Sequence, residues 1–356
     1  MVMKYNNYIN GKWVASDSGK VFESLNPADE SVVGHFQLST RADVRHAITS
    51  AHSAFPSWRD TPAPSRAKYL WKMRDLLIKN KERLACLIVL EMGKVISEAR
   101  GDVQEAIDVF EYMAGEGRRL FGHTTPSELK DKFAMTIRMP VGVVGLITPW
   151  NFPIAIPAWK SAAALICGNT IVWKPSSDTP LCSVEFTKLL EEIGLPNGIF
   201  NMVTGSGWDI GDEIIRHQMI RGISFTGSRE TGEHILKNAG VKKIGLELGG
   251  KNAVIIMDDA NIDLAVDGVV WGAFGTTGQR CTSASRVVVH EKIKNVFEKK
   301  LLSRVKNLRV GEGIHHDIGP LINSKAVEKS LRYVQIGIEE GAKLLCGGKS
   351  LKINGC

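Results

Sequence analysis

The stretch that decides the fold is residues 141–174, VGVVGLITPWNFPIAIPAWKSAAALICGNTIVWK. It opens with a β-branched run over 141–147, passes through a proline-containing turn into small residues over 158–167, and ends with a second apolar run over 170–173. β-Branched runs favour strands, and the small-residue segment is long enough for a helix. The stretch therefore predicts a strand–turn–helix–strand unit with a helical crossover.

The alternation of predicted strands and helices continues along the chain. Further helices are predicted over 180–193, 208–216, 228–238, 261–274 and 293–305, and further strands over 198–203, 222–226, 243–246, 253–257 and 285–290. Strands that alternate with helices of this length indicate a parallel sheet with helices on both faces. We therefore expect an α/β protein, with a second, smaller α/β unit after the main sheet.

The first 120 residues are predicted to be largely helical. Thr40 is placed to cap one helix, and Glu91 to Ala114 is expected to continue the helical pattern until Gly115 ends it. The segment 118–140 is polar with a short alternating run, which is typical of a hairpin or a linker.

The composition excludes several classes of protein. With 44% hydrophobic and 23% charged residues, the chain is neither disordered nor fibrous, and 356 residues suggest two domains. The six cysteines form no C-x-x-C pair and no zinc-type spacing, so we expect no metal and a reducing compartment. The N-terminus lacks a signal-type apolar segment, which predicts a cytoplasmic protein without a membrane span.

The net charge of +7 is compatible with an anionic small ligand. The basic run 292–309 has an apolar stripe and no interleaved aromatics, so we interpret it as a solvated helix face, and no nucleic-acid partner is expected.

Two glycine-containing turns link a strand to a helix, at 205–211 and at 225–232. Such turns let a ligand phosphate approach the backbone at a helix N-terminus, where Ser228 is also placed to cap its helix. The G-x-G-x-x-x-G spacing of the first turn misses the usual dinucleotide fingerprint, and a plain turn with a cap is the alternative. Lys174 ends a strand and is either a ribose or phosphate ligand or a surface lysine.

Three other residues carry candidate chemistry. Cys281 stands beside Arg280 in a polar turn, where a cation and backbone N–H groups favour the reactive thiolate, although most free cysteines are inert core residues. Glu247, flanked by leucines at a strand end, is expected to be desolvated and suited to general-base work, with a salt-bridge role as the alternative. The amide of Asn151 is able to stabilise an oxyanion, or simply forms a turn between prolines.

Together these segments resemble the aldehyde dehydrogenase superfamily. The motifs TPWNFP (148–153), VWKPS (172–176), FTGS (225–228), LELGGKN (246–252) and GQRCTS (278–283) occur in the family's order and at similar spacing. The resemblance runs from about residue 8 to the end of the chain. It implies oxidation of an aldehyde, with a semialdehyde as one candidate, to the carboxylic acid with NAD or NADP, through a cysteine thiohemiacetal and thioester.

The resemblance also implies residue roles. Cys281 matches the nucleophile, Glu247 the general base and Asn151 the oxyanion side chain. The positions matching cofactor contacts are Trp150, Asn151, Lys174, Ser176, Ser177, Gly207, Gly211, Gly227, Ser228 and Leu248. Ser177 stands where NAD-preferring relatives often carry Glu, so NADP is admissible. Phe152 and Trp159 match aromatics of the substrate tunnel. Arg280 suggests a substrate with a distal carboxylate, or else it pairs with a carboxylate of the protein.

The domains implied are a Rossmann-like dinucleotide-binding domain over 1–117 and 141–246, a hairpin for oligomerisation over 118–140, and a partial catalytic domain over 247–356. Family members continue past the position of Cys356 into an E-[IV]-F-G-P motif that this sequence lacks, and full-length relatives are homo-oligomers. Two alternatives stay open: a CoA-acylating semialdehyde dehydrogenase, and a truncated fragment that binds nucleotide without catalysis.

Overall fold

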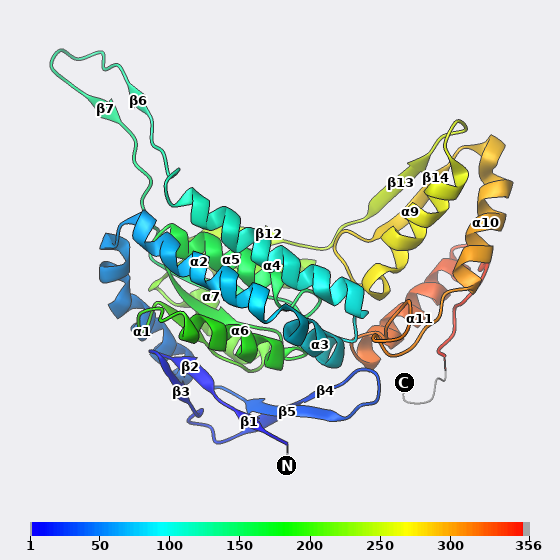
Figure 1. The fold of residues 1–356 in the computed structure, drawn as a ribbon, viewed down its shortest axis with the longest axis horizontal. Helices are drawn as coiled ribbons and strands as arrows, with labels where there is room; N and C mark the ends of the chain where they lie inside the picture. The colour runs from blue at the N-terminus through cyan, green and yellow to red at the C-terminus, as the bar shows by residue number, and fades with distance from the viewer. Residues whose placement is uncertain (1, 352–356) are drawn as a thin grey trace.

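The computed structural model describes residues 2–351, and Cys356 lies outside them. Its centre is a seven-stranded sheet with the strand order β12-β11-β8-β9-β10-β2-β3 (Figure 1). The parallel strands are β8 (Val143–Ile147), β9 (Thr170–Lys174), β10 (Phe200–Met202), β11 (Ile220–Thr226) and β12 (Lys243–Glu247). The strands β2 (Asn7–Ile9) and β3 (Lys12–Val14) extend the sheet in antiparallel fashion.

Helices cover both faces of this sheet. One face carries α2 (Ala63–Lys79), α3 (Lys81–Met92), α4 (Ile96–Glu116), α5 (Ala155–Ile166) and α6 (Pro180–Glu192), and the other carries α1 (Arg41–Asp60), α7 (Gly207–Arg216) and α8 (Arg229–Asn238). Strand β8 is buried on both faces because its apolar side chains alternate. Val144 and Leu146 pack into the core beneath α2 to α6, while Val143 and Ile147 pack into the core beneath α1, α7 and α8. The predicted α/β class with a helix-covered parallel sheet is therefore confirmed.

The prediction that the first 120 residues are largely helical is wrong before Thr40. Residues 4–37 form β2, β3 and a separate sheet of β1 (Lys4–Tyr5), β5 (Val32–Gln37) and β4 (Val21–Leu25). These strands are only two to six residues long, and one of them, β2, pairs Tyr8 with the distant Met202, so local periodicity does not reveal them. The predicted cap is confirmed, because the Thr40 side chain accepts from the Asp43 N–H in a capping box.

The continuous helix predicted over 91–114 is also wrong. Helix α3 ends at Met92, its C-cap Gly93 has φ 83°, and α4 begins only at Ile96. A Cβ at Gly93 would lie 2.8 Å from the Pro320 ring, so both the backbone angle and the space favour glycine. The break matters because Lys94, immediately after it, becomes fully buried.

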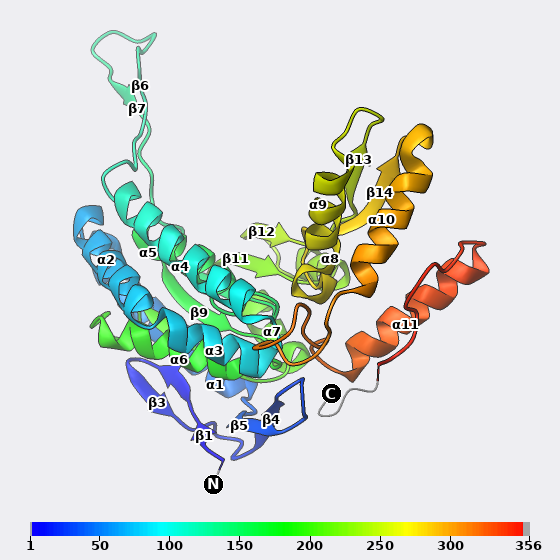
Figure 2. The same ribbon diagram turned by 45° about the vertical axis from the view of Figure 1, so that its right-hand side comes forward.

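A smaller unit follows the main sheet (Figure 2). It contains the parallel pair β13 (Asn252–Ile256) and β14 (Ala284–Val289), the helices α9 (Ile262–Phe274) and α10 (Lys294–Lys306), and the short turns η1 (Gly275–Gly278) and η2 (Glu291–Ile293). Its own apolar core includes Ile256, Val270 and Phe297. Helix α11 (Ser324–Glu339) comes after it. Within residues 2–351, no helix is long and apolar enough to cross a bilayer.

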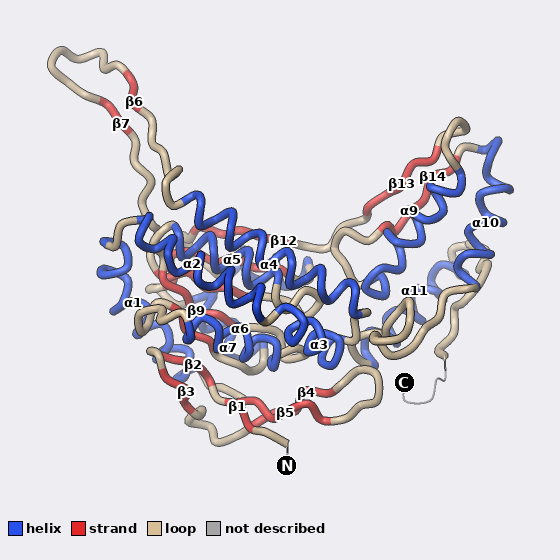
Figure 3. The backbone as a smooth tube through the Cα atoms, in the orientation of Figure 1, coloured by secondary structure: helices blue, strands red, loops and turns tan. Residues whose placement is uncertain are grey.

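The segment 118–140 forms a hairpin with strands β6 (Thr124–Thr125) and β7 (Ala134–Met135). It projects away from the helical layer as a long arm (Figure 3). The arm exposes large apolar side chains, namely Phe121, Leu129, Phe133, Met135, Ile137 and Met139. Such a density of exposed apolar side chains is typical of a surface that contacts another protein.

A buried carboxyl group of α3 predicts a pH dependence of stability. Glu91 Oε1 accepts from Leu181 N at 2.7 Å and from Ser24 Oγ at 2.9 Å, and Oε2 accepts from Cys182 N at 2.7 Å. Burial raises the pKa of Glu91 to about 7, although these donors act to lower it, against 4.5 for an ordinary glutamate. Between those two pH values the unfolded chain has released a proton that the folded chain retains. Raising the pH across this interval should therefore cost about 3 kcal/mol of stability.

The change that tests this is Glu91→Gln, compared with the wild type by denaturant unfolding at pH 5 and pH 8. Other titrating groups contribute equally to both proteins, so the difference between the two curves isolates Glu91. The wild type should lose more stability than the variant between the two pH values. Parallel curves would show that Glu91 titrates in the folded protein as it does in the unfolded chain, and a steeper loss in the variant would show that folding lowers its pKa; either result would contradict the prediction.

Candidate active site

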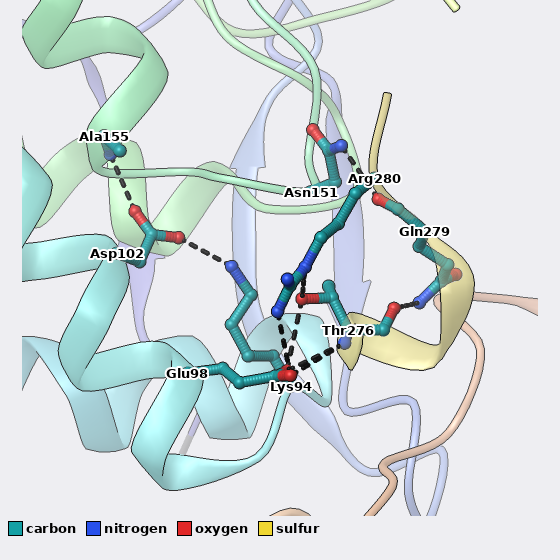
Figure 4. A network of polar contacts seen from close by, with 8 residues as sticks. All are labelled: Lys94, Glu98, Asp102, Asn151, Ala155, Thr276, Gln279 and Arg280. Atoms are coloured by element: carbon teal, nitrogen blue, oxygen red, sulfur yellow. Dashed lines mark hydrogen bonds and ion pairs between the residues drawn. The ribbon is translucent and has the colours of Figure 1, made fainter. Parts of the chain in front are cut away.

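Asn151 lies in the turn between β8 and α5. Its side-chain Nδ2 donates to the Gln279 carbonyl at 2.9 Å, and its Oδ1 is buried without a hydrogen-bond partner among residues 2–351. Gln279 stands two residues before Cys281. The turn after β8 therefore touches the turn that carries the thiol (Figure 4).

Cys281 lies between η1 and β14, and its side chain is exposed. Asn252 Nδ2 donates to the Cys281 carbonyl at 2.8 Å, and a Cβ at Gly250 would lie 3.2 Å from the same oxygen. Strand β12 ends at Glu247, only three residues before Gly250. The segment that follows Glu247 therefore contacts the turn that carries Cys281. The structure thus brings together the three turns that carry Asn151, Glu247 and Cys281.

The expectation that Glu247 is desolvated is wrong, because its side chain is exposed. Leu246 and Leu248 pack against the core beneath α7 and α8, so the residue between them points to the opposite side of the strand. A cation lies near it: Lys160 Nζ donates to Ser224 Oγ at 2.9 Å. Burial lowers the pKa of Lys160 to about 8, and the negative charge of Glu247 opposes that shift.

A cavity of about 130 Å³ lies where β8 and β9 end. Its lining comes from the two strand ends and from helices α7 and α8, and consists of Ile147, Lys174, Gly207, Trp208, Gly211, Asp212, Ile215, Thr231 and His234. The carboxyl edge of a parallel sheet is where open α/β folds bind ligands. Three of the residues predicted to bind cofactor, Lys174, Gly207 and Gly211, therefore share one cavity, and burial lowers the pKa of the Lys174 amine to about 8.

Other predicted cofactor contacts surround the same strand ends. Ser177 Oγ donates to the Gly205 carbonyl at 3.0 Å, just before α7, and Ser176 Oγ donates to Asp178 at 3.2 Å. The Ser228 side chain caps α8 by accepting from Thr231 N at 3.2 Å.

Of the remaining three predicted contacts, Gly227 makes a backbone hydrogen bond, while Leu248 and Trp150 pack against neighbouring residues. Gly227 N donates to the Glu247 carbonyl at 3.1 Å, and Leu248 approaches Gly232 so closely that a Cβ there would lie 2.9 Å from it. Trp150 is partly buried against the core that lies between the sheet and helices α2 to α6.

The predicted substrate residues lie in two environments. The Phe152 ring stands 3.7 Å from Lys94 Nζ, whereas Trp159 is 40% exposed. The Arg280 guanidinium pairs with Glu98 at 2.8 Å and lies over the Trp271 ring. Of the two roles considered for Arg280, the structure thus contains the ion pair with a protein carboxylate.

Sequence reasoning missed a buried ion pair behind the site. Lys94 Nζ lies 2.9 Å from Asp102 Oδ2, and both side chains are completely buried. Asp102 Oδ1 also accepts from the Ala155 N–H at 2.7 Å, at the start of α5 (Figure 4). The pair therefore ties α4 to the segment that carries Asn151 and Phe152. A lysine directly after a helix-breaking glycine was the only local signal.

Comparison with known proteins gives one consistent result. The model of the aldehyde dehydrogenase family matches residues 13–356. The chain is 42% identical over 353 residues to the alpha-ketoglutaric semialdehyde dehydrogenase of Bacillus subtilis, which covers 98% of this chain and 72% of that protein. It is 38% identical over 346 residues to the NADP⁺ succinate-semialdehyde dehydrogenase of Escherichia coli, covering 96% and 72%.

Solved structures agree with these relatives. An NADP-dependent enzyme of Escherichia coli superposes with a TM-score of 0.96 at 37% identity, over 98% of this chain and 73% of that one. The betaine aldehyde dehydrogenase of Staphylococcus aureus, solved in complex with NAD⁺, gives a TM-score of 0.97 at 37% identity, over 99% and 71%.

Proposed function

Because the chain belongs to the aldehyde dehydrogenase family, we propose that it oxidises an aldehyde to the carboxylic acid with NAD⁺ or NADP⁺ as hydride acceptor. One observation carries the proposal: Asn151, Glu247 and Cys281 come from three separate segments, yet their turns meet through the contacts at Gln279 and Gly250. A nucleophile, a base and an amide donor are the groups that thioester-forming oxidation of a carbonyl requires.

The chain's own residues divide the chemistry among them. The Cys281 thiolate attacks the aldehyde carbon and forms a thiohemiacetal, whose oxyanion is stabilised by the Asn151 amide and the Cys281 backbone N–H. The dinucleotide, when bound, supplies the hydride acceptor that makes the oxidation to a thioester possible. Glu247 then takes a proton from water, which attacks the thioester and releases the acid. The exposure of Glu247 supports this last role, since the attacking water must reach it.

The residues at the carboxyl edge of the sheet fit a dinucleotide. The cavity beside Lys174 offers a buried amine with its pKa lowered to about 8, the N-terminus of α7 at Gly207, and the apolar surfaces of Ile147 and Trp208. Amine and helix N-terminus suit the ribose and phosphate groups, while the apolar surfaces suit a base. We assign the parts 1–117 and 141–246 to this binding domain and 247–356 to the catalytic part.

Cofactor preference is tested at Ser177, whose hydroxyl lies beside the turn that precedes α7. A serine does not repel a 2′-phosphate, so the wild type should use NADP⁺. Ser177→Glu places a negative charge there and should raise the KM for NADP⁺ by about tenfold or more, since like charges in contact are costly. The KM for NAD⁺ should change by less than about threefold. Initial rates with both cofactors measure this, with Ser177→Ala as the size control. A wild type that strongly prefers NAD⁺ would contradict the assignment.

The substrate class proposed is a semialdehyde. The names of the relatives support it, since several act on semialdehydes. Arg280 is the chain's candidate for the distal carboxylate, but its guanidinium already pairs with Glu98, so a substrate would have to share that cation. Comparing succinic semialdehyde with butyraldehyde tests the class, because the two share the four-carbon aldehyde chain and differ at the distal carboxylate.

The CoA-acylating alternative is separated by the product. Glu247 argues against it, because transfer of the acyl group to a thiol needs no water-activating base. Incubating the purified chain with an aldehyde and NAD(P)⁺, with and without CoA, should give the free acid at the same rate in both cases. A requirement for CoA would establish the alternative, and cofactor binding without turnover would favour a non-catalytic nucleotide-binding protein.

For the arm over 118–140 we propose an oligomer contact. Its exposed apolar side chains, among them Phe121 and Phe133, support this role. Sedimentation of the intact chain tests it, and a monomer would count against it.

A further inference from the structure

The turn before the nucleophile has an unusual backbone. Thr276 has φ 52° and ψ 33°, and Thr277 has φ 58° and ψ 31°, so two successive β-branched residues occupy the left-handed region. That region is unfavourable for β-branched residues, and such conformations persist only where the surroundings hold them. Since Cys281 follows only four residues after Thr277, whatever holds this turn also sets the place of the thiol.

Glu98, in the first turn of α4, makes the contacts that hold it. Its Oε2 and Oε1 accept the Thr276 N–H at 2.8 and 3.0 Å, and Oε2 also accepts from Thr276 Oγ1 at 3.1 Å. The next residue is fixed separately, because Thr277 Oγ1 donates to the Gly319 carbonyl at 2.9 Å.

Arg280 closes the network on the side of the cysteine. Its Nη2 donates to Glu98 Oε1 at 2.8 Å, and its Nε donates to Thr276 Oγ1 at 2.8 Å (Figure 4). The side chains of Arg280 and Glu98 are only 11% and 17% exposed, so solvent screens this ion pair little. Glu98 therefore contacts the turn at two residues: Thr276 near its start, and Arg280 next to the proposed nucleophile Cys281.

The helix that carries Glu98 is itself anchored. Four residues before Glu98, Lys94 pairs with Asp102, and Asp102 holds the start of α5 through Ala155. Helix α4 therefore contacts both turns: Glu98 binds the turn that carries Cys281, and Asp102 binds the segment that follows Asn151.

We propose that Glu98 is a positioning residue of the active site: through Thr276 and Arg280 its carboxylate fixes the left-handed turn and so holds Cys281 in register with Asn151 and Glu247. This inference rests on the proposed function. Glu98 takes no part in bond making, and its effect is on where the thiol stands. Misplacing a reacting group by about an ångström costs on the order of 10²-fold in rate.

Two variants separate positioning from plain stability. Glu98→Ala removes every contact to the turn, and Glu111→Gln is the matched control, since Glu111 is a carboxylate of the same helix that pairs with Arg74 instead. Glu98→Ala should lower kcat by about ten- to a hundredfold with little change in KM, at a temperature where both proteins remain folded. Glu111→Gln should retain wild-type kcat.

Rescue provides the sharper readout. Glycine adopts the left-handed region at little cost, so Thr276→Gly in the Glu98→Ala background should restore about fivefold or more of the lost kcat. The same change in the wild type should not raise kcat. If Glu98 served only to stabilise α4, glycine at position 276 would restore nothing, and that result would overturn the proposal.

Hydrogen exchange tests the proposal without turnover. Amides of 275–281 should exchange about tenfold faster in Glu98→Ala than in the wild type, while those of the middle of α4 keep their rates. Unchanged exchange of 275–281 would also overturn the proposal. A wild-type chain that oxidises no aldehyde would contradict the proposed function instead, and the exchange rates would still decide the role of Glu98.

Discussion

Replacing Cys281 by alanine should abolish aldehyde oxidation. The thiol is the nucleophile of the proposed reaction, and its removal leaves no group in the turn 279–283 that can form the thioester. Loss of a nucleophile from a catalytic set lowers kcat by at least about 10⁴-fold. The measurement is the rate of NAD(P)H formation at saturating aldehyde.

The control for this prediction is Cys86→Ala. Cys86 is also an exposed free cysteine, but it lies on α3, outside the site. That variant should retain wild-type rates and cofactor binding. If Cys281→Ala still reduced the cofactor at the wild-type rate, the assignment of the nucleophile would be refuted.

Replacing Glu247 by glutamine should trap the acyl-enzyme. The thiol of Cys281 can still form the thioester, but the amide of glutamine cannot accept a proton from water, so hydrolysis should slow by about 10²–10⁴-fold. A single burst of NAD(P)H per active site should appear, followed by slow turnover. Mass spectrometry should find the acyl group on the peptide that contains Cys281.

The matched control is Glu291→Gln, which changes an exposed glutamate of η2 and should turn over normally without an adduct. Rapid steady-state turnover of Glu247→Gln with no added mass would mean that another group activates the water. Lys160, whose pKa burial lowers to about 8, would then be the first to examine. Release of the adduct at full rate by CoA would instead support the acyl-transfer alternative.

Much of the fold followed from local patterns. The strand–helix alternation after residue 141 was readable because buried parallel strands are continuous apolar runs and their crossover helices keep a helical period. The strands before Thr40 were not readable because they are only two to six residues long, and one of them, β2, pairs Tyr8 with Met202 nearly two hundred residues away. The break at Gly93 escaped notice because glycine within a helical pattern is compatible with either continuation or termination.

The candidate site divides in the same way. The motifs around Asn151, Glu247 and Cys281 were visible in the sequence, and the structure brings their turns together. The exposure of Glu247 was misjudged because successive side chains of a strand point to opposite faces. Burial of Leu246 and Leu248 on one face therefore does not bury the residue between them. Glu98 and the Lys94–Asp102 pair carried no local signature, since their meaning arises only from contacts between α4 and segments far along the chain.

The spacing of Glu98 and Asp102 on α4 has a consequence for how this region can vary. Four residues apart, the two carboxylates project from one side of the helix, one toward Thr276 and the other toward Ala155. Inserting or deleting a single residue between them would rotate one relative to the other by about 100°. The contact of Glu98 with Thr276 and that of Asp102 with Ala155 could then no longer form together. Insertions and deletions in related sequences should therefore be found in the β6–β7 arm and not at the start of α4.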